Sequence, residues 1–497
     1  MTALLPNRTL IIDLPGPDLT PAQARFLAQH SFGGVCLFAR NFSTPQRTAQ
    51  LVKDIRDALG HDALIATDQE GGAVLRRLDR PHAPTPQALG VIGSEEAARE
   101  AGRIAARGLI ELGINWNYAP SLDVNVNPLN PVIGERAFGS DPELVARLGV
   151  AWALGSEEEG VLSAVKHFPG HGDTTQDSHL TLPTVNKSHA ELEQTEWRPF
   201  RAAVAAGVGS IMTAHIVYSA LDAVQPATLS PAFLTDLLRT DWKYDGVVVT
   251  DATDMHAIAD RHPHGEAAPL ALLAGADAVL SCGHGDLNTH ADHALALQRA
   301  LDEGRLSPRR VAQALSRLER VASRFPGTPR PYSLPQQQAD EEQIGAWAAQ
   351  SLGFSGDWPT LDPAAPLLLI VPETSDLGGP YGDAPSGAAL ADAIRPHFPA
   401  LQVGLLRRDP AEALALLTQF PTAPILFATT NRWSLGAAQT ALLPTLQTRP
   451  HVIHLALWNP EHAAALPFPA LISHGFRPAN LQAVAQALAV SRPHGAG

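Results

Sequence analysis

Cysteine is almost absent from this chain of 497 residues, which has only Cys36 and Cys282. Each cysteine stands in an apolar, strand-like run far from the other, so we expect two reduced core residues and no disulfide framework. No apolar run approaches the roughly 18 residues needed to span a bilayer. The N-terminus, MTALLPNRTLIIDLPG, has no basic stretch followed by an apolar run and a small-residue cleavage site. These absences favour a soluble cytoplasmic protein.

Positive charge is also scarce. The chain has 36 lysines and arginines against 50 aspartates and glutamates, which gives a formal net charge of −14. This charge argues against nucleic acid and anionic membranes as partners, because little positive charge is available to neutralise phosphates. Lysine is the rarer cation and occurs only at positions 53, 166, 187 and 243. Lys166 is therefore notable, because its position calls for a compact point charge instead of an arginine fork.

Apolar residues make up 45% of the chain, which is enough for sizeable cores, and the length predicts two or three domains. Between residues 1 and 325, short β-branched runs alternate with longer helical patterns. This alternation predicts a (β/α)8 TIM-like barrel, although a doubly wound open sheet would give the same pattern. The eight runs are LIIDL (10–14), GVCLFA (34–39), LIATD (64–68), INWNYAP (114–120), SAVKHF (163–168), SIMTAH (210–215), GVVVTD (246–251) and AVLSC (278–282).

A second α/β alternation follows a proline-rich stretch. Residues 326–340, PGTPRPYSLPQQQAD, are typical of a linker, and the helical segment EEQIGAWAAQSL comes next. Residues 341–497 then predict a smaller three-layer α/β sandwich domain, which leaves residues 1–325 as the barrel domain. The strand candidates of the second domain are 367–372, 401–406, 424–429 and 451–457, with 470–475 as a fifth.

Polar and charged side chains stand at the ends of the predicted barrel strands. Asp68, Lys166, His167, His215 and Asp251 each fall at or just past the C-terminal end of a run. In a TIM barrel this face carries the active site. Residues that only stabilise the fold would be scattered over both ends of the strands. The pattern therefore favours a functional site.

The stretch KHFPGHGDTTQDSH (166–179) is rich in histidine and aspartate and is broken by Pro-Gly and Gly-Asp turns. A metal site is one interpretation. However, Pro169 and the glycines oppose the helix that would align His167 with His171, so their spacing does not indicate a metal site. His171, Asp173, Asp177 and His179 could still converge on an ion from a loop.

Asp177 and His179 give the same stretch a catalytic interpretation. A carboxylate two residues from an imidazole can accept its N–H, fix its tautomer and raise its pKa. The imidazole can then act as a general acid near neutral pH. A solvated loop with only a local Asp–His contact is the alternative.

The run GVVVTD ends in a second candidate, Asp251. A carboxylate at that end of a buried strand can act as nucleophile, base or metal ligand. Asp254, three residues further on, is expected to cap the next helix.

Two more stretches add charged residues after predicted strands. Asp68 is followed by a Gly-Gly turn and then by Arg76 and Arg77, one of which could bind a polar substrate. A predicted loop after the fourth run carries Glu135 and Arg136. Internal ion pairs are the alternative for each of these residues.

The stretch KHFPGHGDTTQDSHLTLPTV resembles the signature of glycoside hydrolase family 3, specifically its β-N-acetylglucosaminidase (NagZ-type) branch. Four other stretches stand in the order typical of that family and extend the resemblance over most of residues 10–285. They are FARNFSTPQ, TDQEGG, NPVIGERAFGSDP and VVVTDATDM. A barrel followed by an α/β sandwich also resembles the two-domain members.

This resemblance implies a role for each matching residue. Asp251 would be the nucleophile, and His179 the acid/base paired with Asp177. The residues implied to bind the sugar hydroxyls and the N-acetyl group are Asp68, Arg76, Arg136, Lys166 and His167, with His215 a weaker candidate. The chain departs from the family in two places: EGGAVLR has Ala73 where EGGRVxR is usual, and TDATDM replaces the common SDDLSM. The first change removes an arginine contact, and the second keeps the aspartate and the methionine.

The expected activity is retaining exo-β-N-acetylhexosaminidase activity on terminal β-linked N-acetylglucosamine of muropeptide or chitooligosaccharide fragments, without a cofactor or metal. A β-N-acetylglucosaminide phosphorylase is an alternative, because a neutral histidine repels phosphate less than a carboxylate does. A β-glucosidase of the same family and a non-catalytic sugar-binding protein are further alternatives. The expected partner is a small carbohydrate, and the expected state is a monomer or a homodimer.

Overall fold

The chain forms two units in the computed structural model, which describes residues 5–128, 130, 132–174, 182–374, 386–407, 409–432 and 434–490. The first unit spans residues 1–86 and 93–337, and the second spans residues 87–92 and 338–497. Asp177 and His179 lie outside the described residues. Each unit is considered by itself below.

The first unit is built on parallel strands. Among the described residues, eight of them form one sheet in the order β10-β1-β2-β3-β4-β5-β7-β9, and a bridge between Val249 and Ala278 joins the two ends. The prediction of a TIM-like barrel is confirmed, and each strand lies within its predicted run, except that β5 begins one residue earlier, at Leu162. They are β1 (Leu10–Asp13), β2 (Gly34–Leu37), β3 (Leu64–Thr67), β4 (Trp116–Asn117), β5 (Leu162–Phe168), β7 (Ser210–Thr213), β9 (Val247–Val249) and β10 (Val279–Ser281).

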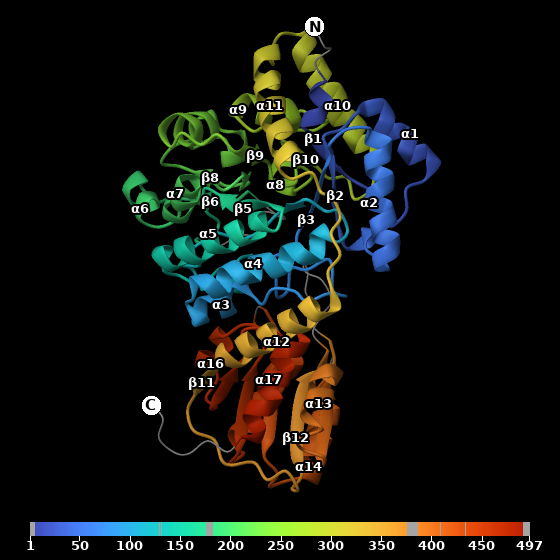
Figure 1. Ribbon diagram of the computed structural model, residues 1–497. Helices are drawn as coiled ribbons and strands as arrows, with labels where there is room; N and C mark the ends of the chain where they lie inside the picture. Colours follow the sequence, from blue (N-terminus) through green and yellow to red (C-terminus); the bar gives the residue numbers. More distant parts are fainter. Residues whose placement is uncertain are drawn as a thin grey trace. The chain divides into compact units, whose positions relative to one another are not determined.

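Helices follow the strands and surround the sheet (Figure 1). Their starts follow from local chemistry: Thr20, Thr44 and Asp141 each accept a backbone N–H at a helix N-terminus, with proline in the first turn. The longer helices are α1 (Pro21–His30), α2 (Pro45–Leu59), α4 (Glu95–Ile110), α5 (Pro142–Glu158), α7 (Trp197–Ala206), α9 (Ala267–Ala274), α10 (Leu287–Asp302) and α11 (Pro308–Arg324). Shorter elements include η2 (Ala39–Asn41), η3 (Gly134–Arg136), α6 (His189–Gln194), the π-helix η5 (Ala232–Asp241), α8 (His256–Ala259), and the pair β6 (Thr184–Val185) and β8 (Val217–Tyr218).

The interior of the barrel is a separate apolar cluster. Because side chains alternate between the two faces of a strand, every second residue of each strand points inward. The inward set includes Leu64 and Ala66 of β3, Leu162 and Ala164 of β5, and Val247 and Val249 of β9, all in one buried cluster. Cys36 and Cys282 belong to the same cluster and are free and buried, which confirms the prediction of reduced core cysteines.

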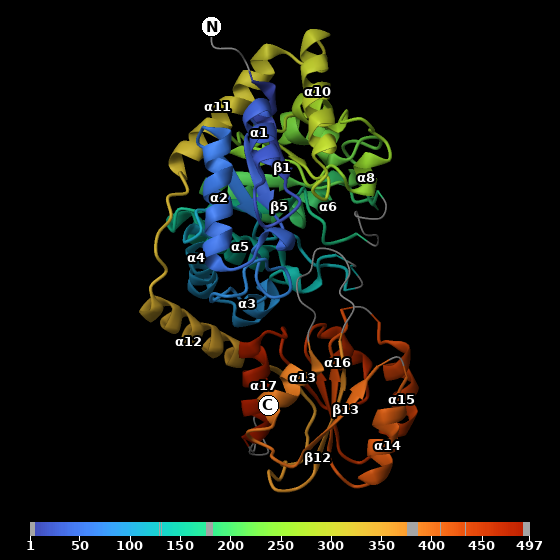
Figure 2. The ribbon, with the colours of Figure 1, turned by 90° about the vertical axis from the view of Figure 1, so that its right-hand side faces the viewer.

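The second unit is a sheet between two helical layers (Figure 2). Its strand order is β11-β16-β15-β14-β12-β13 among the described residues, parallel except for β11. Leu368 and Phe427 of the sheet pack against Leu417 and Leu446 of two helices. The predicted three-layer α/β sandwich is confirmed. Its strands are β11 (Gly353–Ser355), β12 (Leu367–Pro372), β13 (Leu401–Leu406), β14 (Ile425–Thr429), β15 (Val452–Ala456) and β16 (Ala470–Ile472), and its helices include α12 (Leu334–Gln350), α13 (Gly387–Ile394), α14 (Ala411–Gln419), α15 (Ala437–Gln447), α16 (Glu461–Ala465) and α17 (Pro478–Ala489).

Two local predictions differ from the structure. Helix α12 begins at Leu334 and therefore includes part of the predicted linker 326–340; Pro335 is compatible with this because proline is tolerated in the first turn, where no N–H is needed. Strand β11 was not predicted, because its three residues carry little apolar pattern. In the described part of the chain, no helix is long and apolar enough to cross a membrane.

Candidate active site

The inward-facing positions change from apolar to charged at the carboxyl ends of the barrel strands. Leu64 and Ala66 point inward, so Asp68, two residues further on, points inward as well. In the same way Leu162 and Ala164 are followed by an inward-pointing Lys166. By the same two-residue period, Asp251 follows Val247 and Val249. Three charged side chains from three strands are thereby directed to one end of the barrel axis, the end where TIM barrels carry active sites.

Lys166 is the cation at the centre of this group. Its side chain is 3% exposed, and its Nζ lies 2.8 Å from Asp68 Oδ1 and 2.7 Å from Glu70 Oε1. Burial alone would lower the pKa of Lys166, but Asp68 and Glu70 outweigh it and the pKa is raised. Arg76 is a weaker neighbour, with Nη2 3.6 Å from Asp68 Oδ2. Lys166 therefore stays charged and holds two carboxylates in fixed positions.

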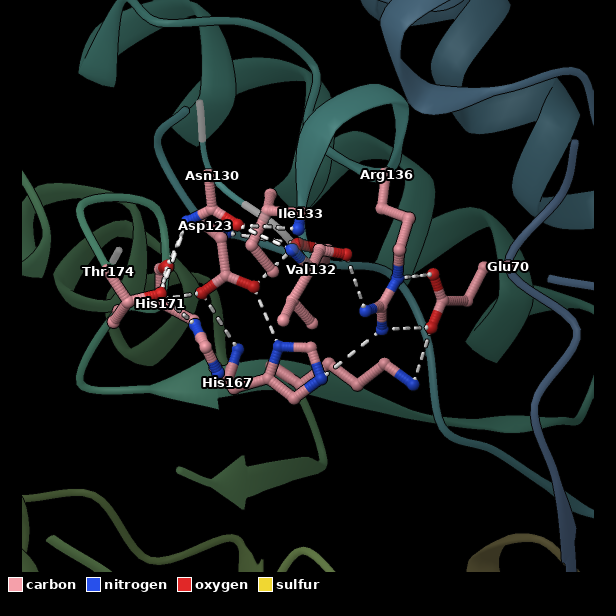
Figure 3. A network of polar contacts seen from close by, with 12 residues as sticks. Glu70, Asp123, Asn130, Val132, Ile133, Arg136, His167, His171 and Thr174 are labelled. Carbon is pink, nitrogen blue, oxygen red and sulfur yellow. Dashed lines mark hydrogen bonds and ion pairs between the residues drawn. The ribbon is translucent and has the colours of Figure 1, made fainter. Parts of the chain in front are cut away.

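Glu70 links Lys166 to Arg136, which ends η3. Arg136 donates two parallel hydrogen bonds to the Glu70 carboxylate, both 2.8 Å long. Burial would raise the pKa of Glu70, but Arg136 and Lys166 outweigh it and hold that pKa far below its usual range. The arginine also donates to His167 Nε2 over 3.3 Å. The network thus continues toward the histidine-rich stretch 166–179, called the histidine loop below (Figure 3).

Asp123 holds the described part of the histidine loop. Its Oδ2 accepts from His167 Nδ1 at 2.7 Å, and its Oδ1 accepts from the backbone N–H of His167 and of His171 at 3.2 and 2.6 Å. Because Nδ1 donates and Nε2 accepts from Arg136, this pattern selects the His167 tautomer with the proton on Nδ1. Asn130 donates to the His171 carbonyl at 2.8 Å, and His171 Nδ1 lies 2.8 Å from Thr174 Oγ1 (Figure 3).

Gly172 is required by the same arrangement. A Cβ on this residue would lie 1.7 Å from the carbonyl oxygen of Val124, which no side chain could accommodate. The loop base from Lys166 to Thr174 is thus packed against the segment after β4. Within the described ranges, no three His, Cys, Asp or Glu side chains gather to hold an ion. The metal interpretation also involves Asp177 and His179, which lie outside these ranges.

Asp251 is the partly exposed member of the group. Its Oδ1 accepts the N–H of Ala252 at 2.7 Å. The Asp251 and Asp68 charges both help to raise the pKa of the Tyr118 hydroxyl, after burial as the largest cause. Tyr118 belongs to the interior cluster of the barrel. His215 supports the same segment, because its Nε2 donates to the Ala252 carbonyl at 2.8 Å.

The structure brings together Asp68, Arg76, Arg136, Lys166 and His167 from the predicted set. Arg77 turns away to Glu111 and Asp79, so of the two neighbouring arginines only Arg76 contacts Asp68. Sequence reasoning missed Glu70 and Asp123, which both connect predicted residues. The stretch TDQEGG contains Glu70 two positions after Asp68, and this spacing was the only signal for it.

The prediction for Asp254 is wrong. Helix α8 begins at His256 with Met255 as its N-cap residue, and no side chain caps it. Asp254 instead lies 3.0 Å, Oδ2 to Nε2, from His284. The helix starts one residue too late for Asp254 to reach its free N–H groups.

His171 is expected to make the fold sensitive to acid. Burial lowers its pKa from 6.5 to about 4, so between these values the unfolded chain binds a proton that the folded chain does not. The neutral His171 side chain therefore contributes its full share to the free energy of unfolding above pH 6.5, and this share is lost as the pH falls toward 4. When the pH is lowered from 7 to 5, we expect the melting temperature of the His171→Gln variant to fall less than that of the parent protein. An equal loss in both proteins would contradict this assignment.

A protein family and curated relatives match more than half of this chain. The model described as "Glycosyl hydrolase family 3 N terminal domain" matches residues 11–321. The chain is 33% identical over 393 residues to Beta-hexosaminidase A of Pseudoalteromonas piscicida, covering 71% of this chain and 65% of the relative. It is 36% identical over 327 residues to Beta-hexosaminidase of Chromobacterium violaceum, covering 64% of this chain and 88% of the relative.

Solved structures also match this chain. A glycoside hydrolase family 3 beta-N-acetylglucosaminidase from a Paenibacillus species matches with a TM-score of 0.90 and 31% identity, covering 98% of this chain and 96% of that one. NagZ from Neisseria gonorrhoeae, in complex with N-trifluoroacetyl-D-glucosamine, matches with a TM-score of 0.56 and 30% identity, covering 68% of this chain and 97% of that one.

Proposed function

Because this chain belongs to glycoside hydrolase family 3, we propose that it is a retaining, exo-acting β-N-acetylglucosaminidase. The substrate class is terminal β-linked N-acetylglucosamine on muropeptide or chitooligosaccharide fragments, met in the cytoplasm. The similarity to the Paenibacillus beta-N-acetylglucosaminidase over 98% of the chain supports the choice of sugar. The observation that carries the proposal is the convergence of Asp68, Lys166 and Asp251 on one end of the barrel axis.

In the proposed mechanism, Asp251 attacks the anomeric carbon and forms a covalent glycosyl-enzyme. Retaining enzymes need this nucleophile on one face of the sugar and an acid beside the leaving oxygen. His179, held by Asp177, is the proposed acid: its imidazolium protonates the leaving oxygen. The neutral imidazole then takes a proton from the water that releases the sugar. This His–Asp pair takes the place of the second carboxylate of most glycosidases.

The other charged residues are proposed to bind the sugar. Asp68 can accept hydrogen bonds from hydroxyls, and Arg76, Arg136 and Lys166 can donate to hydroxyl and N-acetyl oxygens. Because Lys166 and Arg136 already neutralise Glu70 and Asp68, these groups are fixed before the substrate arrives, which avoids an ordering cost during the reaction. His167 and His215 are proposed as further members of this subsite.

A panel of p-nitrophenyl glycosides, assayed with and without inorganic phosphate, tests the function. We expect p-nitrophenol release from the β-N-acetylglucosaminide to exceed release from the β-glucoside by roughly 100-fold or more, since a site that hydrogen-bonds the N-acetyl group rejects a sugar without it. The sugar product should be free N-acetylglucosamine in both conditions. A sugar 1-phosphate in the presence of phosphate would make the protein a phosphorylase, and binding of N-acetylglucosamine without turnover of any glycoside would exclude catalysis.

A further inference from the structure

A cavity lies at the amino end of the barrel, the end opposite to the candidate active site. Its volume is about 170 Å³, and its walls come from the segments directly before β1, β2 and β3 and from helix α11. Helix α11 covers this end, because its Leu318 and Ala322 pack in the interior cluster together with Leu64, the first residue of β3. The cavity contains none of the residues around Lys166, so it is separate from the site described above.

Arg8 is the permanent cation of this cavity. It lies in the short helix η1 (Pro6–Thr9), directly before β1. A Cβ on Gly33 would lie 2.1 Å from the Arg8 carbonyl oxygen, so only glycine lets these two segments pack this closely. The Nε of Arg8 is buried and has no hydrogen-bond partner in the described part of the chain. A buried donor of this kind costs free energy unless a bound molecule accepts from it.

The other polar groups of the cavity limit which anion can bind. His61 Nε2 lies 2.8 Å from the Phe32 carbonyl oxygen, so Nε2 carries the proton. Burial is the main cause that lowers the pKa of His61, and the charge of Arg8 lowers it further, so the ring is neutral at pH 7. Asp62 and Glu319 also line the cavity, and both are exposed. A dianion such as phosphate would meet one arginine and two carboxylates, whereas a monoanion is repelled less.

The remaining wall of the cavity is apolar. Leu64, Leu318 and Ala322 are buried, and Leu315 is half-buried. Ligand pockets typically combine such walls with a few polar groups that fix the orientation of the ligand. Because a water molecule occupies about 30 Å³ in the liquid, the cavity has room for roughly five or six of them, or for an organic molecule of similar volume. The cavity therefore suits a small molecule with one anionic group and a short hydrocarbon body.

We propose that this cavity binds a small aliphatic carboxylate, with its carboxylate on the Arg8 guanidinium and its hydrocarbon body against Leu64 and Leu318. The guanidinium can donate two parallel hydrogen bonds to a carboxylate, one of them from Nε. The leucine side chains remove the hydrocarbon body from water. Because the cavity is at the other end of the barrel from Asp251, this inference does not depend on the proposed function.

The test is isothermal titration calorimetry of the full chain with 4-methylpentanoate. We expect binding at one site with a Kd of about 1 mM or tighter, an affinity that a ligand of this size can reach. Two further probes separate the contributions: 4-methylpentan-1-ol keeps the hydrocarbon body without the charge, and acetate keeps the charge without the body. Each should bind at least roughly 10-fold more weakly, because each loses one of the two kinds of contact. A Kd weaker than about 1 mM for 4-methylpentanoate, or equal binding of the alcohol, would overturn the inference.

Variants locate the binding site. Arg8→Gln should weaken binding of 4-methylpentanoate at least roughly 10-fold, because it removes the charge-assisted hydrogen bonds. Arg25→Gln is the matched control: Arg25 is exposed on α1 and does not line the cavity, so its replacement should leave the Kd unchanged. An excess of N-acetylglucosamine should also leave it unchanged. Equal Kd values for the two variants, or displacement of 4-methylpentanoate by the sugar, would exclude this cavity as the carboxylate site.

Discussion

Replacing Asp251 by alanine is expected to lower kcat/KM for p-nitrophenyl β-N-acetylglucosaminide by roughly 10⁴-fold or more, the scale typical of losing a nucleophile. In the proposed mechanism no glycosyl-enzyme can form without this carboxylate, and the residues proposed to bind the sugar cannot replace a covalent step. Release of p-nitrophenol at saturating and at low substrate measures kcat and kcat/KM separately. Because the groups proposed to bind the sugar remain, the loss should fall on kcat and leave substrate binding nearly unchanged.

Two controls accompany this variant. Its melting temperature should stay close to that of the parent, since Asp251 is only partly buried. Added azide should restore part of the activity by attacking from the face that alanine leaves open, with an α-glycosyl azide as the product. Near-full activity of Asp251→Ala without azide would exclude the proposed mechanism.

Glu70→Gln is expected to cause the largest loss of stability. Glu70 is 1% exposed and neutralises two buried cations, Arg136 and Lys166. Glutamine keeps the shape but removes the charge, and breaking a buried ion pair from one side costs about 3–5 kcal/mol. Urea unfolding followed by tryptophan fluorescence measures the change. Glu158→Gln is the matched control: it removes a partner of Arg99 and Arg103 at the surface, 41% exposed, and should cost no more than about 1 kcal/mol.

The difference in the free energy of unfolding between the parent and Glu70→Gln should depend on pH in a defined direction. The folded-state pKa of Glu70 is lowered from 4.5, so its charge contributes stability above pH 4.5, and that contribution is lost as the pH falls toward the folded value. The difference between the parent and Glu70→Gln should therefore be constant from pH 6 to pH 8 and should shrink below pH 4.5. A difference that grows in acid would show that Glu70 is not the ionised partner of the two cations.

The fold was largely predictable from the sequence, because each barrel strand is a short apolar run with a helical pattern after it. The same runs located Asp68, Lys166 and Asp251, since a charge directly after a buried strand has only one end of the barrel to occupy. Resemblance to a family then assigned roles that position alone left open. Arg136 needed this help, because it lies on η3 in a loop and not at a strand end.

The missed residues depend on contacts that no local pattern contains. Glu70 meets Arg136 across 66 positions of the chain, and Asp123 meets His167 across 44. Both lie in loops where composition indicates only a turn. Asp254 was assigned to a helix cap by a local rule, whereas its observed partner His284 comes from the loop after a different strand. Such pairs form because closure of the barrel brings together loops that follow different strands. No local sequence pattern indicates which of these loops will be in contact.

The two-residue period of the barrel strands also limits how this chain can vary. Deleting one valine from Val247–Val249 would turn Asp251 toward the surrounding helices, although no remaining residue would be substituted. A deletion of two residues would restore its direction and only lower its position along the axis. The number of residues in the strand can thus change only in steps of two if Asp251 is to keep its direction, whereas the loops after the strands have no such constraint. Changes in substrate range can therefore arise from loop length, because the direction of Asp251 depends on the number of strand residues before it.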